Sequence, residues 1–244
     1  MYARQLFVAY QFDEAASAYM EQLTKGIDDE WANRDGLGKA LMAAQRYAEA
    51  VPYLEQVGAY SSSVLPGAPG REIQLSVCHW ILGDQEQGLK IIRDLVIAVR
   101  DRVITYADLA GGVSQGMILC YMAATLRRQD DIKLASAFLA DRAKNKLRIA
   151  SWPGPAALLL LGAASFEESV QKATGAFDLP QAKTIAKTDL LKRRQLTNIL
   201  FAAAVERRLA GDEARCLAYM TECASLTNPL IEYEWHLARN EVSL

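Results

Sequence analysis

Residues 28–60 read DDEWANRDGLGKALMAAQRYAEAVPYLEQVGAY and are the most informative about the fold. Its apolar and small residues recur three or four positions apart, the spacing that places side chains on one face of an α-helix. A polar gap at Gln45 and Arg46 divides the stretch into two segments. Gly38 and Ala50 are small where two antiparallel helices would have to approach closely. The stretch therefore predicts a helical hairpin.

Parts of this pattern return elsewhere in the chain. Small residues lie at comparable places in successive segments, namely at Ala15, Ala50, Gly88, Ala135 and Cys216. Within residues 28–60, a larger set resembles the tetratricopeptide repeat (TPR) motif: Leu37, Gly38, Ala40, Tyr47, Ala50 and Leu54. The resemblance is good in this hairpin and looser in the segments around the other small residues. It implies a TPR-like α-solenoid of antiparallel helix pairs.

We expect an all-α protein with about twelve helices and no sheet, since the β-branched run at 96–106 has a helical period. The chain is expected to be a single solenoid domain, 1–244, with blocks at 1–60, 67–104, 105–150, 153–195 and 196–244. Gly and Pro residues mark the expected boundaries of helices and loops. They predict a linker at 61–70, a long helix at 85–102, one helix pair at 153–195 with a break at 175–180, and a final helix at 229–241.

Composition limits the classes of function. The chain has 244 residues, 51% of them hydrophobic, and a formal net charge of −2, so no global charge attracts nucleic acid or an anionic membrane. Residues 1–122 are net acidic and residues 123–244 net basic, with Lys and Arg concentrated at 142–194. No secretory signal and no apolar run long enough to cross a membrane is present, which predicts a cytoplasmic protein.

Few residues of the chain are candidates for catalysis or metal binding. The two histidines, His79 and His236, lie outside any HExxH pattern, and the four cysteines lack metal-ligand spacing, which indicates free buried thiols. Glu232 and His236 are four positions apart, the spacing of a polar pair on one helix face. The glycines at 111, 112 and 116 indicate a helix start or close helix packing. We therefore predict no catalytic residue, no metal site and no cofactor.

The TPR resemblance implies that the first helix of each pair lines a concave groove. Trp and Arg dominate the energetics of protein interfaces, so Trp80 carries most weight among the outward candidates, although a Trp beside Ile81 and Leu82 is also typical of a core position. The predicted partner-binding residues are Asp35, Lys39, Met42, Val77, Trp80, Arg127, Asn198 and Arg208.

These observations predict a non-catalytic protein-binding module. A toxin-neutralising immunity protein, an inhibitor or an adaptor that holds one segment of a partner protein, such as a toxin or effector, fits a small helical chain of this kind. Alternatives are a secretion chaperone, an assembly scaffold, a nucleic-acid binder that uses the basic 142–194 region, and an enzyme on a helical scaffold. The oligomeric state stays open.

Overall fold

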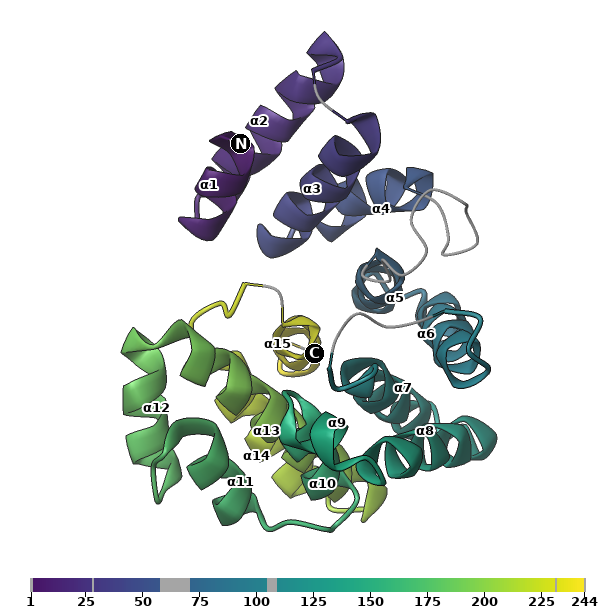
Figure 1. Ribbon diagram of the computed structural model, residues 1–244, viewed down its shortest axis with the longest axis vertical. Coiled ribbons are helices and arrows are strands. Elements are labelled where there is room, and N and C mark those ends of the chain that lie inside the picture. Colours follow the sequence, from purple (N-terminus) through teal and green to yellow (C-terminus); the bar gives the residue numbers. More distant parts are fainter. Residues whose placement is uncertain (1, 28, 58–70, 105–108, 231, 244) are drawn as a thin grey trace. The chain divides into compact units, whose positions relative to one another are not determined.

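The computed structural model describes residues 2–27, 29–57, 71–104, 109–230 and 232–243 (Figure 1). Throughout these ranges the chain forms helices and no strand, which confirms the all-α prediction. The described residues form fifteen helices: α1 (Tyr2–Val8), α2 (Phe12–Lys25), α3 (Glu30–Ala43), α4 (Tyr47–Gln56), α5 (Arg71–Ile81), α6 (Gln85–Arg100), α7 (Val113–Thr125), α8 (Gln129–Ala143), α9 (Lys146–Ala150), α10 (Gly154–Leu160), α11 (Phe166–Thr174), α12 (Leu179–Thr188), α13 (Leu190–Leu209), α14 (Glu213–Ala224) and α15 (Tyr233–Glu241).

The chain folds into two compact units, Met1–Ile91 and Ile92–Leu244, with the boundary inside α6. In the first unit, helices that follow one another in sequence pack together, from α1 against α2 to α4 against α5. The same is true of α7 with α8 and of α13 with α14 in the second unit. The chain is thus built largely from neighbouring helix pairs. The predicted linker at 61–70 lies outside the described residues.

Two glycines of α3 explain how the first unit packs. A Cβ at Gly36 would lie 2.5 Å from the ring of Tyr19 in α2, and a Cβ at Gly38 would lie 2.6 Å from Leu54 Cδ2 in α4. Real side chains do not approach so closely, so only glycine lets α3 pack against both neighbours. The predicted hairpin and its close approach at Gly38 are confirmed.

Helix α13 is the centre of the second unit. It contacts α7, α10, α11, α12, α14 and α15. Its residues from 195 to 205 are buried without interruption, because a helix surrounded on all sides has no solvent face. In α7, which is buried in the same way, Gly112 is the N-cap in the left-handed region (φ 87°), and a Cβ at Gly116 would lie 2.7 Å from Leu139 Cδ2. The expected helix start and close packing at these glycines are confirmed.

Three predicted boundaries are wrong. Residues 153–195 form α10, α11 and α12 before α13 begins, because Gly162 and Gly175 take left-handed conformations and Ser165 starts α11 with a capping box. The final helix begins at Tyr233 rather than at 229, because Leu230 is left-handed (φ 70°). Helix α6 ends at Arg100, two residues early, since Arg102 has a φ of 61°.

Among the described residues, no helix combines the length and the apolar character needed to cross a membrane. The four cysteines are free and buried, as predicted.

Candidate functional site

An open hollow of about 470 Å³ lies on the surface of the first unit, lined by residues of α2, α3 and α4. We call it the α2–α4 groove. Leu37 and Leu41 of α3, one turn apart, contribute apolar side chains to it, and Ala16 contributes from α2. Because α2 and α4 both pack on α3, these leucines lie beneath the gap between the two outer helices. Its volume is within the range of about 300–1,000 Å³ typical of ligand pockets.

Two side chains of the outer helices meet across the groove. Met20 of α2 is 39% exposed, which is high for a large apolar side chain that also borders a hollow. The Tyr53 hydroxyl of α4 lies 3.8 Å from the sulfur of Met20. Both side chains are accessible from solvent, and Met20 can change its conformation because methionine is unbranched and flexible. The groove therefore offers an apolar surface that can rearrange around an occupant.

Charged residues at the groove are paired with one another. Arg46, at the start of α4, contacts Glu49 at 2.7 Å and reaches across to Asp13 of α2 at 2.9 Å. On α2, Lys25 pairs with Glu21. The hydrogen bond from Arg46 lowers the pKa of the Glu49 carboxyl, so this pair stays charged at neutral pH. An occupant with a buried charge would have to compete with these pairs, and the groove therefore favours uncharged apolar side chains.

The predicted site residues of the first unit lie elsewhere. Asp35 and Lys39 form an ion pair of 2.5 Å with each other on α3. Met42 and Trp80 are each 2% exposed and Val77 is fully buried, so their predicted outward orientation is wrong. Trp80 is buried because α5 and α6 pack closely: a Cβ at Gly88 would lie 3.3 Å from Trp80 Cβ. The alternative interpretation of Trp80 as a core residue is confirmed.

In the second unit, Arg127 is exposed on the turn after α7, with a left-handed φ of 56°. Asn198 is buried on α13, where its Nδ2 donates to Glu232 Oε2 at 3.0 Å. The Arg208 side chain is 8% exposed. The outward orientation predicted for Asn198 and Arg208 is wrong, because both side chains hold other helices against α13.

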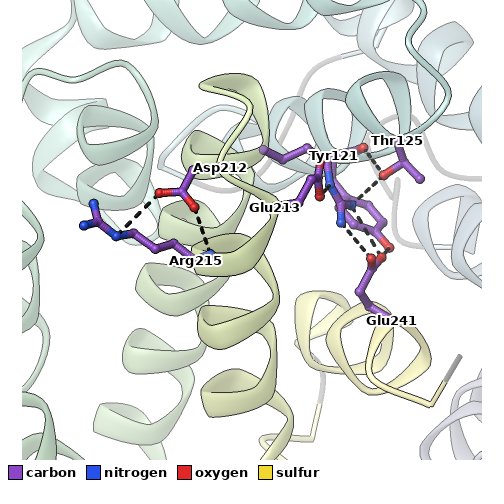
Figure 2. A network of polar contacts seen from close by, with 7 residues as sticks. Tyr121, Thr125, Asp212, Glu213, Arg215 and Glu241 are labelled. Atoms are coloured by element: carbon purple, nitrogen blue, oxygen red, sulfur yellow. Dashed lines mark hydrogen bonds and ion pairs between the residues drawn. The ribbon is translucent and has the colours of Figure 1, made fainter.

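Arg208 is part of a polar network, and Figure 2 labels its partners Thr125, Glu213 and Glu241. Its Nη2 donates to Glu241 Oε1 of α15 at 2.7 Å, and its Nη1 donates to Thr125 Oγ1 of α7 at 2.8 Å. The Tyr121 hydroxyl donates to Glu241 Oε2 at 2.6 Å. Arg208 Nε also donates to Glu213 Oε2 at 3.2 Å. We call Tyr121, Thr125, Arg208, Glu213 and Glu241 the Arg208 cluster.

Electrostatics in the Arg208 cluster favour the charged forms. Burial by itself would raise the pKa of the Glu241 carboxyl, but hydrogen bonds from Arg208 and Tyr121 and the charge of Arg208 lower it. For the Arg208 guanidinium, burial acts to lower the pKa, and the contact with Glu241 outweighs it. The cluster is a polar network in which the charged groups have partners, and it joins α7, α13 and α15. These contacts give the cluster a structural role.

The two histidines differ in how deeply they are buried. His79 Nδ1 lies 3.4 Å from Asp84 Oδ2 near the surface. His236 is buried, and burial, with a contribution from Arg239, lowers its pKa to about 3. The carboxylate oxygens of Glu232, which we expected on one helix face with His236, accept hydrogen bonds from Arg194 and Asn198 of α13. Among the described residues, no group of three or more His, Cys, Asp or Glu side chains is placed to hold a metal ion.

Several cations of the basic 142–194 region take part in intramolecular contacts. Arg142 lies over the ring of Phe138 at 4.4 Å, and Arg193 donates to the backbone oxygens of Ala186 and Lys187. Lys183 pairs with Glu222 at 2.5 Å. These side chains stabilise helix ends and helix contacts, which reduces the charge available to bind a phosphate backbone.

Comparison with protein-family models, with curated proteins and with solved structures gives no match. The assignment of a site therefore depends on geometry. None of the eight predicted residues lines the α2–α4 groove. Met20 and Tyr53 do. Tyr19, the neighbour of Met20 in the chain, packs on Gly36 in the structure, so Met20 lies off the buried face of α2.

Proposed function

We propose that the chain is a protein-binding module of TPR-like helix pairs that holds an apolar helical segment of a partner protein in the α2–α4 groove. One observation carries this proposal: an open apolar hollow with an exposed Met20 lies between two helices, and the charged residues that line the hollow are already paired. Amphipathic helices bind apolar grooves through residues spaced at i, i+3, i+4 and i+7.

The length of the groove supports a short helix as the occupant. Lining residues run from Ala16 to Lys25 along α2, which is about 14 Å at 1.5 Å per residue. That distance accommodates two to three turns of a partner helix. The proposal differs from the sequence-based prediction in one respect, since the groove lies between the second helices of successive pairs and not along the first ones.

Substitution of Met20 tests the proposal. We expect Met20→Lys to weaken binding of the partner at least tenfold, about 1.4 kcal/mol, because a charge would enter the apolar groove. The matched control is Leu217→Lys on α14, a large apolar residue that is 50% exposed and does not line the groove. Both variants should unfold at nearly the parent temperature, since exposed substitutions change stability little.

The measurement has two steps. Partners are captured on the parent chain from lysate of the source cell, with and without nuclease treatment. The segment that the parent binds after nuclease treatment is then synthesised and titrated against all three proteins. A segment bound equally well by the parent and by Met20→Lys would contradict the groove. Capture that disappears on nuclease treatment would instead support nucleic-acid binding.

A further inference from the structure

The first turn of α15 places two acidic side chains in the interior of the second unit. Glu232 is the N-cap residue of the helix and Glu234 follows two positions later. Glu234 is 0% exposed and Glu232 is 8% exposed. Acidic residues are rarely buried to this degree without compensating charges, so the groups that surround them decide their state.

Each helix that faces this pair contributes a different group. From α7, the Ser114 hydroxyl contacts Glu234 Oε1. From α13, Arg194 Nε donates to Glu232 Oε1 at 2.5 Å and Asn198 Nδ2 to Glu232 Oε2 at 3.0 Å. From α14, the thiol of Cys223 is close enough for both carboxylates to raise its pKa further, after burial. We call Ser114, Arg194, Asn198, Glu232 and Glu234 the Glu234 cluster.

The contacts divide unequally between the two carboxyl groups. Both oxygens of Glu232 accept hydrogen bonds from α13, one of them from a cation. Glu234 has the neutral Ser114 hydroxyl on one oxygen, and no hydrogen-bond donor among the described residues reaches Glu234 Oε2, which is fully buried. An ionised carboxylate with an unsatisfied buried oxygen is costly, whereas a protonated carboxyl needs fewer partners and can itself donate to Ser114 Oγ.

Other nearby groups do not supply the missing positive charge. Burial lowers the pKa of His236 to about 3, so this imidazole is neutral above that pH. The thiol of Cys223 is neutral as well, because burial raises its pKa. Arg239 lies over the ring of Trp235 and is exposed. In the described contacts, two carboxyl groups therefore share the guanidinium of Arg194, whose side chain is itself 36% exposed.

Two effects on Glu234 oppose each other. The helix N-terminus favours a negative charge in its first turn by a modest amount. Burial disfavours the charge and can shift a carboxyl pKa by several units. Burial is the larger effect: with the neighbouring charge of Glu232, it raises the pKa of Glu234 from its ordinary 4.5 to about 7, although the Ser114 hydroxyl, the backbone N–H of Glu234 and the charge of Arg194 act in the opposite direction.

From this arrangement we propose that Glu234 is a proton-dependent contact of α15: the neutral carboxyl holds the first turn of α15 on α7, and its ionisation loosens that turn. The direction of the pH dependence follows from linkage. Because the folded-state pKa is raised, the stabilisation is fully present below the ordinary pKa of 4.5 and is lost as the pH rises through about 7.

Hydrogen exchange of the α15 amides in the full chain tests this proposal. Protection factors, which are corrected for the intrinsic pH dependence of exchange, are measured at pH 5.5 and 8.5 by NMR. We expect the parent to lose about tenfold or more protection in α15 at the higher pH. Glu234→Gln should keep its protection at both values, because the amide cannot ionise. The matched control, Glu167→Gln, changes an exposed glutamate of α11 and should respond like the parent.

Three outcomes would overturn the proposal: parent protection that is equal at the two pH values, a Glu234→Gln variant that responds like the parent, or a Glu167→Gln variant that loses the response. A second measurement applies even if Glu234→Gln does not fold. The carbon-13 shift of the Glu234 carboxyl in the parent should titrate near pH 7, and a midpoint at or below the ordinary 4.5 would contradict the proposal.

Discussion

The two ends of α15 carry the same kind of side chain in opposite electrostatic settings. At the C-terminal end, Glu241 faces Arg208 at 2.7 Å, and Tyr121 donates to its second oxygen. At the N-terminal end, Glu234 faces a serine hydroxyl and a second carboxylate. The pKa of Glu241 is lowered and that of Glu234 is raised. Both glutamates connect α15 to α7, so acid should weaken one connection and base the other.

The difference shows that burial alone does not set the state of a carboxyl group. The Glu241 side chain is 18% exposed and has a cation with well-aligned donors, which outweighs its desolvation. Glu234 is more deeply buried and shares a cation with Glu232. The number and alignment of donors therefore decide the sign of the shift, and the predictions below act on these donors one at a time.

Arg208→Met should have the largest effect on the C-terminal end. It leaves Glu241 mostly buried without its cation, and we expect a loss of about 2–4 kcal/mol in the free energy of unfolding at pH 7, measured by urea denaturation. The variant should also lose the acid sensitivity of the pair. In the parent, the contribution of Glu241 is present above its ordinary pKa of 4.5 and is lost as the pH falls through its lowered folded value.

A control for Arg208→Met is the pH profile itself. If the parent and the variant lose stability in parallel between pH 5 and 3, Glu241 is not held by Arg208 in solution, and the contrast between the two ends of α15 does not hold.

Tyr121→Phe should have a smaller effect on the same end. It removes the hydroxyl that donates to Glu241 Oε2 but keeps the ring that packs 5.3 Å from Phe201. Since Arg208 still satisfies the carboxylate, we expect about 1 kcal/mol of destabilisation in the same denaturation experiment. A loss as large as that of Arg208→Met would show that the hydroxyl, rather than the cation, holds α15.

Arg215→Ala should have the smallest effect. Arg215 pairs with Asp212 at 3.5 Å at the start of α14, within two residues of Glu213 of the Arg208 cluster, and Figure 2 shows this pair apart from the contacts of that cluster. Its side chain is 67% exposed, and exposed ion pairs contribute little because solvent screens them. We expect a change below about 0.5 kcal/mol in the free energy of unfolding. A larger change would mean that proximity to the cluster matters more than burial.

Local patterns predicted much of the helical architecture. The five small residues proposed as packing anchors are buried, and at Gly38 and Gly88 a Cβ would collide with the neighbouring helix. These positions were predictable because close helix contact demands a small residue wherever it occurs. The boundaries at 229 and within 153–195 were not predicted, since they depend on left-handed residues such as Leu230, whose conformation no local spacing reveals.

The candidate site was predicted least well. Met42, Val77 and Trp80 were expected to face a partner and are buried, while Met20, which lines the groove, was not among the predicted residues. A helical period shows which residues share a face, but it does not show how many faces are covered. Helix α3 packs against α2, α4 and α5, so the face predicted to be open is covered.

The helical character of the chain, the turns between most helix pairs and the small residues at close contacts can all be predicted from local spacing, because these properties depend on only a few neighbouring residues. The tertiary structure decided which faces stay open, where the α2–α4 groove lies, and that two glutamates of α15 differ in pKa. Exposure and ionisation depend on side chains contributed by distant segments, such as Ser114 to Glu234 and Arg208 to Glu241, and only the packed fold brings these segments together.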